Sequence, residues 1–312
     1  MNPQESSSPV IAIVGPTASG KSALAIEVAL KLNGEIINCD SVQVYREIQI
    51  ATAKVPVAER KGIPHHLIDF VSPEVNYTAV EWATEAAAKI EDIERRGRVP
   101  IFAGGTGFYL RALRKPFFVS PKTDEHLRRR INAMREKHGP EYLHRVLIRL
   151  DLHAAQQLYP RDWPRVQRAI EVFIQTGTSI FVQRADRPEP AESSRRLRIL
   201  VLNPPRQELY KRINERTDAH FQAGLVEEVQ GLLARGVPGN SNALGAHGYR
   251  RVVEYLQGLR TLENAVEQTK LDVRHYAKRQ LTWFRREEGV EWLHGFGEQY
   301  EVLQAALEYL AG

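Results

Sequence analysis

The sequence predicts an α/β fold: a parallel sheet flanked by helices, with a mainly helical insertion domain. Two observations predict the sheet. Short apolar runs alternate with segments of helical spacing, and a glycine-rich motif joins the first run to the first helix. The insertion is predicted because the strand signal is lost over residues 115–195 and then returns. We therefore expect a discontinuous core domain, residues 1–114 and 196–312, and an insertion domain, residues 115–195.

Four apolar runs are the expected core strands. They are residues 10–14, 35–38, 99–103 and 197–202. The first run is continuously apolar, which is typical of a strand buried on both faces. Helical spacing follows at Leu24, Val28 and Leu32, and an alanine-rich helical stretch precedes the third run. The insertion is rich in arginine and closes with a Pro/Ser/Glu-rich linker over residues 184–194.

The composition is that of a folded protein. Of the 312 residues, 43% are hydrophobic, which is enough to bury a core, so disorder throughout is excluded. We expect a cytoplasmic protein, because the chain shows neither a membrane-spanning apolar run nor a signal segment. The single cysteine, Cys39, excludes an internal disulfide and a cysteine-based zinc site. The 43 Lys and Arg against 38 Asp and Glu, a net charge of +5, only weakly suggest a nucleic-acid partner.

Residues 15–22 carry the clearest functional motif. The segment Gly-Pro-Thr-Ala-Ser-Gly-Lys-Ser fits G-x-x-x-x-G-K-[ST] and stands between a predicted strand and a predicted helix, as a phosphate-binding P-loop requires. Backbone N–H groups of such a loop point at the phosphates, while Lys21 supplies a cation and Ser22 a hydroxyl for Mg²⁺. This context argues against a chance Gly/Ser-rich turn. The candidate diphosphate-binding residues are Gly15, Pro16, Thr17, Ala18, Ser19, Gly20, Lys21 and Ser22.

A P-loop does not by itself define the reaction. Many P-loop enzymes hold Mg²⁺ with an Asp at the end of a second strand, but the strand over residues 99–103 ends in Gly-Gly-Thr-Gly. Asp40 lies where ligands bind in open α/β sheets, although a helix cap or loop carboxylate is an equal alternative. Thr106 either caps the next helix or places a hydroxyl against a phosphate. For His65 and His66 structural or packing roles are favoured, because adjacent strand residues face opposite sides and cannot both face one metal.

Residues 261–286 predict one long helix without Gly or Pro. Lys270, Arg274 and Lys278 recur every four residues and form a cationic stripe, which only Asp272 offsets. Basic and aromatic side chains together suit single-stranded RNA, because they bind its phosphates and its unstacked bases. At this point a solvated helix face is an equal alternative.

Taken together, these segments resemble the tRNA dimethylallyltransferase family in its bacterial form. The matching segments run in order over nearly the whole chain: residues 15–22, 40–45, 51–54, 64–69, 104–110, 165–171, 248–250 and 277–285. The Asp-Ser…Tyr, Gly-Gly-Thr-Gly and Lys-Arg-Gln-x-Thr-Trp segments are far more specific than the P-loop. The chain departs from the family pattern at Ala51, where Gly is common, and at His247, where an apolar residue is common.

The resemblance implies a P-loop NTPase-like core and a prenyltransferase. Its reaction would move a dimethylallyl group from dimethylallyl diphosphate to N6 of the adenosine at tRNA nucleotide 37, next to the anticodon, releasing diphosphate in the presence of Mg²⁺. Asp40 would accept the amine proton, Thr106 would help place the substrates, and Arg216 would reach the diphosphate. The contacts implied for the tRNA anticodon stem-loop are Asp40, Ser41, Val42, Gln43, Arg165, Gln167, Arg168, Gly245, Ala246, His247, Gly248, Tyr249, Arg250, Lys278, Arg279, Gln280, Thr282, Trp283 and Arg285.

Two other functions fit the motifs. The main alternative is a P-loop nucleotide or small-metabolite kinase that uses the arginine-rich insertion as a lid. The other is an RNA-binding P-loop protein without catalysis. We expect a monomer, and the sequence does not specify which tRNAs would be modified.

Overall fold

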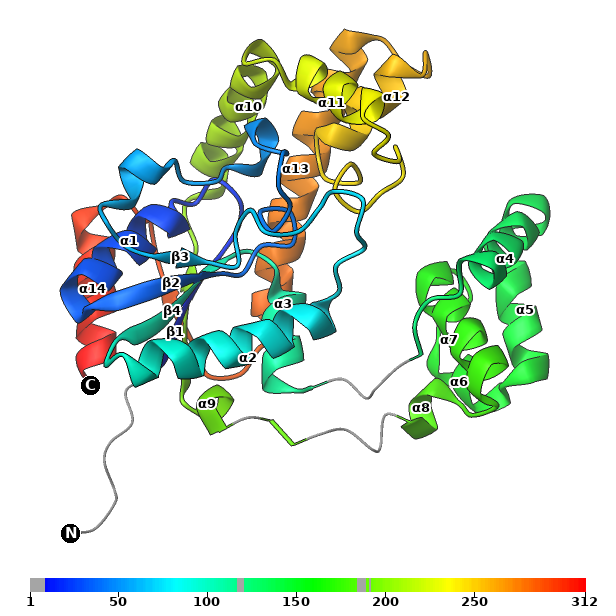
Figure 1. Cartoon of the computed structure of the whole chain (residues 1–312), viewed down its shortest axis with the longest axis horizontal. Helices are drawn as coiled ribbons and strands as arrows, with labels where there is room; N and C mark the ends of the chain where they lie inside the picture. The colour runs from blue at the N-terminus through cyan, green and yellow to red at the C-terminus, as the bar shows by residue number, and fades with distance from the viewer. Residues whose placement is uncertain (1–8, 117–120, 184–188, 191) are drawn as a thin grey trace. The chain divides into compact units, whose positions relative to one another are not determined.

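The computed structural model describes residues 9–116, 121–183, 189–190 and 192–312, and the chain divides into two compact units (Figure 1). One unit combines Met1–Arg114 with Ala191–Gly312, and the other is Lys115–Pro190. Residues 184–188 and 191 of the predicted linker lie outside the described residues. Among the helices that are described, none has both the length and the apolar character needed to cross a membrane.

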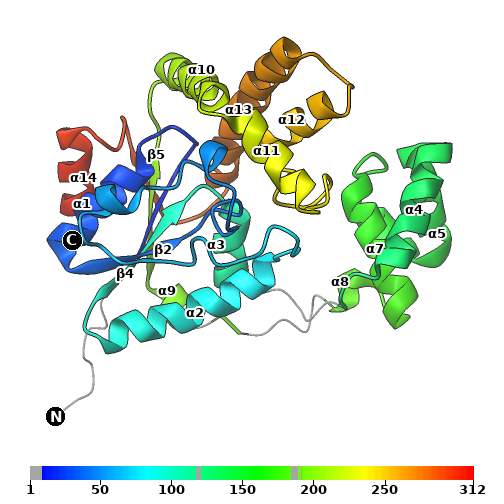
Figure 2. The same ribbon diagram turned by 45° about the horizontal axis from the view of Figure 1, so that its top comes forward.

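A parallel sheet forms the centre of the first unit and confirms the predicted fold class (Figures 1 and 2). Its described strands are β1 (Val10–Val14), β2 (Gly34–Asn38), β3 (His65–His66), β4 (Val99–Gly104), β5 (Leu197–Leu202) and β6 (Val290–Leu293). They lie in the order β3-β2-β4-β1-β5-β6, so β4 separates the P-loop strand β1 from β2. The sequence pattern does not predict the edge strands, because β3 is only two histidines long and the four residues of β6 mix polar with apolar side chains.

Helices cover both faces of this sheet. All five residues of β1 are fully buried. On one face Ile11 and Ile13 belong to a core that includes α1 (Lys21–Leu32) and α14 (Tyr300–Ala311). On the other face α2 (Ala79–Arg95) and α3 (Gly107–Arg114) pack together, and their Trp82 and Tyr109 rings stack with centroids 4.7 Å apart. The loop between β2 and β3 contains the 3-10 turns η1 (Ile50–Thr52) and η2 (Val57–Arg60).

The chain after β5 adds a group of helices beside the sheet (Figure 2). They are α10 (Arg206–Gln222), α11 (Leu225–Ala234), α12 (Tyr249–Leu256) and α13 (Leu262–Phe284), and the short α9 (Glu192–Arg195) precedes β5. Lys270 of α13 contacts Asp218 of α10 at 2.8 Å and Glu267 at 2.9 Å. The prediction that only Asp272 offsets the cationic stripe is therefore wrong. Glu267 lies one turn earlier on α13, and the packing of α10 against α13 brings Asp218, which is distant in sequence.

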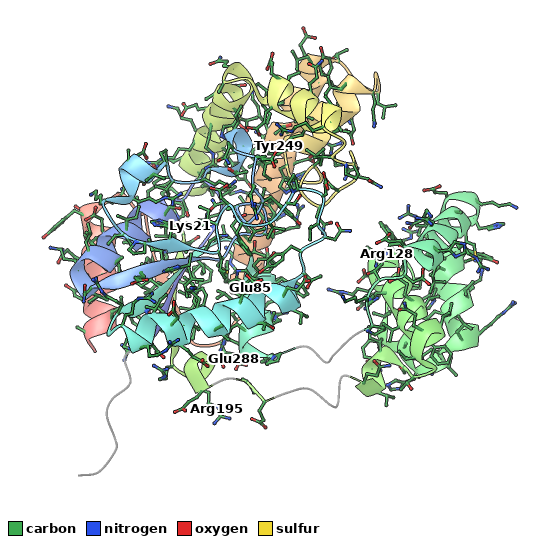
Figure 3. All side chains as sticks on the ribbon, viewed as in Figure 1. Lys21, Glu85, Arg128, Arg195, Tyr249 and Glu288 are labelled. Atoms are coloured by element: carbon green, nitrogen blue, oxygen red, sulfur yellow. The ribbon has the colours of Figure 1, made fainter. Side chains whose placement is uncertain are left out.

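The second unit is helical throughout its described elements. These are α4 (Glu125–His138), α5 (Pro140–Leu150), α6 (Leu152–Gln157), α7 (Trp163–Thr176) and α8 (Ile180–Gln183). Ile131, Leu143 and Ile170 belong to its apolar core. The fully buried carboxylate of Glu171 accepts two hydrogen bonds from Arg128, at 2.8 and 2.9 Å (Figure 3 labels Arg128). An internal ion pair thus joins α4 to α7.

Candidate functional site

The P-loop lies between the end of β1 and the start of α1. Gly15 has a φ of +151°, and a Cβ there would lie 3.0 Å from the backbone oxygen of Leu202, so the turn needs glycine. The Nζ of Lys21 donates to the Pro16 carbonyl at 3.2 Å. Burial lowers the pKa of Lys21 to about 8, although the charge of nearby Asp40 opposes this shift. An anionic ligand would therefore stabilise the charged form of this lysine.

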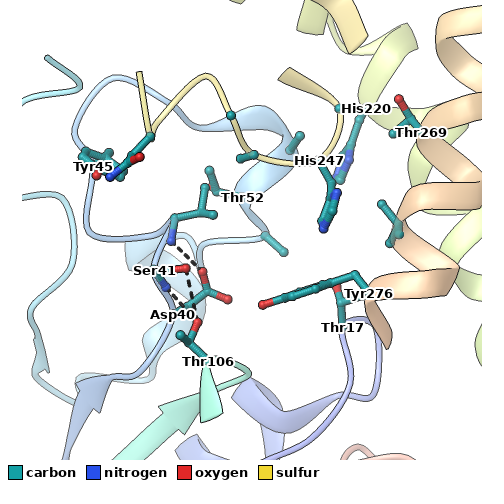
Figure 4. A pocket seen from close by; sticks show the side chains of 18 of the residues that line it. Thr17, Asp40, Ser41, Tyr45, Thr52, Thr106, His220, His247, Thr269 and Tyr276 are labelled. Atoms are coloured by element: carbon teal, nitrogen blue, oxygen red, sulfur yellow. Dashed lines mark hydrogen bonds between the residues drawn. The ribbon is translucent and has the colours of Figure 1, made fainter. Parts of the chain in front are cut away.

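Asp40 stands just beyond β2, where several hydrogen bonds fix its orientation (Figure 4). Its Oδ1 accepts from the backbone N–H groups of Val42 at 2.9 Å and Gln43 at 3.4 Å. Its own N–H donates to Oδ1 of Asn38 at 3.1 Å, and the Asn38 carbonyl accepts from the Trp82 indole at 2.9 Å. These bonds occupy one carboxylate oxygen, and the other points into the neighbouring cavity (Figure 4).

Thr106 lies beside Asp40 because hydrogen bonds join the loops that follow β2 and β4 (Figure 4). The Thr106 Oγ1 accepts from the Ser41 N–H at 3.0 Å, and the Thr106 N–H donates to the Cys39 carbonyl at 3.1 Å. A Cβ at Gly104 would lie only 2.0 Å from that Cys39 oxygen. The first glycine of Gly-Gly-Thr-Gly is thus required for the two loops to meet.

Gln280 of α13 connects the P-loop to the same glycine-rich turn through two hydrogen bonds. Its Nε2 donates to the Gly105 carbonyl at 2.9 Å, and its Oε1 accepts from the Thr17 N–H at 2.9 Å. A Cβ at Gly105 would lie 2.0 Å from Nε2, so the second glycine makes room for this side chain. With 4% of its surface exposed, Gln280 is a link inside the fold and does not face outward as a tRNA contact would.

Arg216 approaches the P-loop from α10. Its guanidinium donates to the Thr17 hydroxyl. Burial lowers the pKa of Arg216, and the charge of Asp40 partly offsets that shift. Arg216, Lys21 and Ser22 line a cavity of about 450 Å³, which Asp40 borders. Two cations thus converge on one space, as an anion-binding site requires.

A second cavity, of about 580 Å³, shares part of its lining with the first. Thr17, Asp40 and Arg216 line both cavities. The ring-bearing side chains that line the second cavity are Tyr45, Tyr77, Phe108, Tyr109, His220, Phe221, His247 and Tyr276. We call this space the aromatic cavity. A ligand with an anionic end at the P-loop and an apolar end in the aromatic cavity would pass beside Asp40.

The predicted tRNA contacts near this cavity differ in their accessibility. Ser41, Val42 and residues 245–248 line the aromatic cavity, while Gln43 lines the P-loop cavity. Tyr249 is fully buried, where its hydroxyl accepts from the Ala51 N–H at 3.3 Å and donates to Glu228. Its ring is therefore not available to stack on a base. Arg250 is exposed and pairs with Glu254 at 3.1 Å.

The predicted contacts at the end of α13 lie on more than one face of the helix. The exposed members are Lys278, Arg279, Thr282 and Arg285. Lys278 and Arg285 line a separate cavity of about 650 Å³, which Tyr276 and Gln280 do not line. The ring of Trp283 lies under the Arg111 guanidinium at 4.0 Å and meets the edge of Phe108 at 6.2 Å.

In the insertion unit the three predicted tRNA contacts occupy different environments. Arg165 is exposed and pairs with Asp162 at 3.0 Å. Gln167 is 5% exposed and donates to Glu171 at 3.2 Å. Arg168 donates to Glu171 at 3.2 Å and to the Pro121 carbonyl at 2.7 Å. Gln167 therefore supports the buried ion pair, whereas Arg165 faces outward.

No group of three His, Cys, Asp or Glu side chains within the described ranges forms a metal site. Ser22 and Asp40 both line the P-loop cavity, where a divalent ion would share ligands with a bound phosphate. This fits Mg²⁺, which usually takes one or two protein ligands together with substrate phosphates and water. His66 contacts Glu35 at 2.7 Å and His65 contacts the Ile63 carbonyl at 2.8 Å, so both rings make polar contacts within the fold.

The sequence patterns do not indicate the position of Tyr276 beside Asp40 or the supporting role of Gln280. The two residues are four apart on α13 and therefore lie on one face of the helix. That spacing is the signal from which their common placement could have been found. The sequence does not show that this face turns toward the P-loop, because the contact joins segments more than 250 residues apart.

Comparisons with known proteins agree with the motifs. A family model described as IPP transferase matches residues 43–287. The tRNA dimethylallyltransferase of Solibacter usitatus is 44% identical over 303 residues, which cover 97% of this chain and 98% of that protein. The tRNA dimethylallyltransferase of Koribacter versatilis is 45% identical over 302 residues, which cover 96% of each.

Solved structures give the same result. The tRNA isopentenylpyrophosphate transferase of Bacillus halodurans superimposes with a TM-score of 0.72 at 35% identity, over 97% of this chain and 96% of that one. A eukaryotic dimethylallyltransferase that acts on tRNA gives a TM-score of 0.78 at 30% identity, over 98% of this chain and 78% of that one. The sequence resemblance is confirmed, and the chain belongs to the IPP transferase family, with the tRNA dimethylallyltransferases as its relatives.

Proposed function

We propose that this protein transfers a dimethylallyl group from dimethylallyl diphosphate to N6 of the adenosine at nucleotide 37 of tRNA. The observation that carries the proposal is the position of Asp40, which borders both the P-loop cavity and the aromatic cavity. A donor with its diphosphate at the P-loop would place its reactive carbon near this boundary. An adenine in the aromatic cavity would present its amine to the same carboxylate.

The cations at the P-loop suit the departure of diphosphate. When the allylic C1–O bond breaks, its electron pair leaves with the diphosphate, and negative charge grows on the oxygens that Lys21 and Arg216 would face. Arg216 is already bonded to Thr17, and Gln280 holds the Thr17 backbone. The groups that would stabilise the negative charge are thus positioned before the substrate binds. Such preorganisation is the condition for strong electrostatic stabilisation.

The Asp40–Thr106 pair suits activation of the amine. The lone pair of N6 is delocalised into the adenine ring, so the amine is a weak nucleophile and requires activation. As the N6–C1 bond forms, the nitrogen becomes positive and loses one proton, which the free oxygen of Asp40 is placed to accept. Thr106 would orient the two substrates, since its hydroxyl is fixed by the Ser41 N–H.

Mg²⁺ is the metal we propose for the P-loop cavity. Ser22 would supply the protein ligand, and the diphosphate oxygens would supply others. The bound ion would add positive charge beside the leaving group.

The anticodon stem-loop would contact the exposed basic residues and the rim of the aromatic cavity. The exposed residues that we propose are Arg165, Arg250, Lys278, Arg279, Thr282 and Arg285. Residues 245–248 would contact the extruded nucleotide, because an adenine must leave its stack to reach Asp40. We further propose that the protein works in the cytoplasm as a monomer.

Incubation with labelled dimethylallyl diphosphate, Mg²⁺ and tRNA tests the proposed function. Label should enter tRNA that carries adenosine at nucleotide 37, and a tRNA with guanosine there is the control. A parallel reaction with labelled ATP tests the kinase alternative. Phosphoryl transfer without prenylation would replace the proposal by that alternative, and tRNA binding without either reaction would favour a non-catalytic RNA-binding protein.

A further inference from the structure

Tyr276 lines the aromatic cavity but has no role in the proposed reaction. The side chain projects from α13, and its hydroxyl faces Asp40 and Thr106 (Figure 4). Gln280, one helical turn later, bonds to both the P-loop and Gly105 at 2.9 Å. The helix face that carries Tyr276 is therefore fixed relative to the two residues that the hydroxyl faces.

His247 supports the ring of Tyr276 from within the cavity. The two ring centroids lie 4.8 Å apart, with their planes tilted by 51°. Burial lowers the pKa of His247, and the charge of Arg279 acts in the same direction, so the imidazole is neutral at neutral pH. A neutral ring can replace the apolar residue common in the family. His247 therefore limits the motion of the tyrosine without adding a charge near Asp40.

The Tyr276 hydroxyl remains protonated under the conditions of the reaction. Burial raises its pKa well above the usual value, and the charge of Asp40 raises it further. A neutral phenol has one proton to donate and an oxygen that accepts hydrogen bonds. It can therefore serve a neutral amine, which presents two hydrogens.

We propose that Tyr276 is a third contact for the acceptor amine, alongside Asp40 and Thr106. This inference rests on the proposed function. N6 carries two hydrogens, and the carboxylate of Asp40 takes one of them. The phenol oxygen accepts a hydrogen bond from the other N–H. This bond holds the amine in the orientation that directs its lone pair at C1. Tyr276 thereby helps select a base with an exocyclic amine.

The test compares Tyr276→Phe with Tyr210→Phe as the matched control. Tyr210 also approaches α13, where Arg274 lies over its ring at 5.9 Å, but its hydroxyl bonds to Arg206 at 3.0 Å and it lines the separate cavity. The first measurement is single-turnover prenylation at saturating donor. The second is the affinity of two anticodon stem-loops, one with adenosine and one with purine riboside, which lacks the amine, at nucleotide 37.

Tyr276→Phe should lower the single-turnover rate by about tenfold, the effect of one hydrogen bond made in the transition state. It should also reduce the preference for adenosine over purine riboside, while Tyr210→Phe leaves both quantities unchanged. A slower Tyr276→Phe enzyme with the wild-type base preference would overturn the inference, as would a wild-type rate. If the wild-type protein transfers no label, the proposed function fails, and the binding comparison still decides whether Tyr276 contacts the amine.

Discussion

The charge of Lys21 should make donor binding depend on pH. In the free protein burial lowers the pKa of Lys21 to about 8. About nine-tenths of the molecules then carry the charge at pH 7 and about one-tenth at pH 9. If only the charged lysine binds diphosphate, the dissociation constant for dimethylallyl diphosphate should rise about tenfold between pH 7 and pH 9. An ordinary lysine with a pKa near 10.5 would leave the constant almost unchanged.

Titration calorimetry with dimethylallyl diphosphate and Mg²⁺ at pH 7, 8 and 9 measures this effect. Lys21→Met is the control, because it removes the titrating group and retains the pH dependence of the ligand, the metal and the rest of the site. The variant should bind weakly at every pH, with a flatter profile than the wild type. Equal slopes in the two proteins would refute the link between the buried lysine and donor affinity.

The same pKa shift has a consequence for stability. The unfolded chain keeps the ordinary lysine pKa of 10.5, so between about pH 8 and 10.5 it binds more protons than the folded protein at this position. The contribution of Lys21 to the free energy of unfolding therefore increases as pH rises through this window. Lys21→Met should lack this contribution in urea titrations of the ligand-free protein.

Three further predictions concern other parts of the molecule. Asp40→Asn keeps an oxygen for the N–H groups that bind Oδ1 but loses the base, so tRNA affinity should persist while single-turnover prenylation falls by about 10²–10⁴-fold; a wild-type rate would exclude Asp40 from the proton transfer. Arg279→Ala should weaken tRNA binding and reduce the log–log salt slope by about 0.7–0.9, whereas an unchanged slope would identify a solvated side chain. Glu171→Ala leaves the Arg128 guanidinium without its buried partner and should lower the free energy of unfolding by about 3 kcal/mol, measured by urea denaturation. That value is at the low end for broken buried pairs because the Arg128 side chain is 36% exposed. A loss under about 1 kcal/mol would contradict the interpretation that this ion pair stabilises the insertion unit.

Local sequence signals predict the elements whose determinants are local. The run Val10–Val14 is continuously apolar because both faces of β1 are covered, and the structure places the strand at those residues. The P-loop is recognisable because its glycines and Lys21 have fixed spacing between a strand and a helix. The cationic stripe shows the limit of such signals. Asp218 neutralises Lys270 from another helix, and a pattern confined to α13 cannot reveal this.

Residue type alone also does not tell a surface contact from an internal one. Tyr249 and Gln280 are tRNA contacts that the family resemblance implies, yet both are buried. Each bonds to a backbone group far away in the sequence, Tyr249 to Ala51 and Gln280 to Thr17. Their polar groups are satisfied inside the protein, and only the packing of helices against the sheet determines this.

The glycine-rich end of β4 is consistent with the proposal that this P-loop binds a prenyl diphosphate. In many P-loop enzymes the Mg²⁺-binding carboxylate follows a second strand and supports attack at a terminal phosphate. Here β4 lies between β1 and β2, and its end carries Gly104 and Gly105 instead of a carboxylate. The missing side chains leave room for the Asp40 loop on one side and for Gln280 on the other. The carboxylate comes instead from the loop after β2, a strand farther away, where Asp40 borders the aromatic cavity as well as the P-loop cavity. In the proposed reaction, this position would let Asp40 deprotonate a nucleophile that attacks carbon.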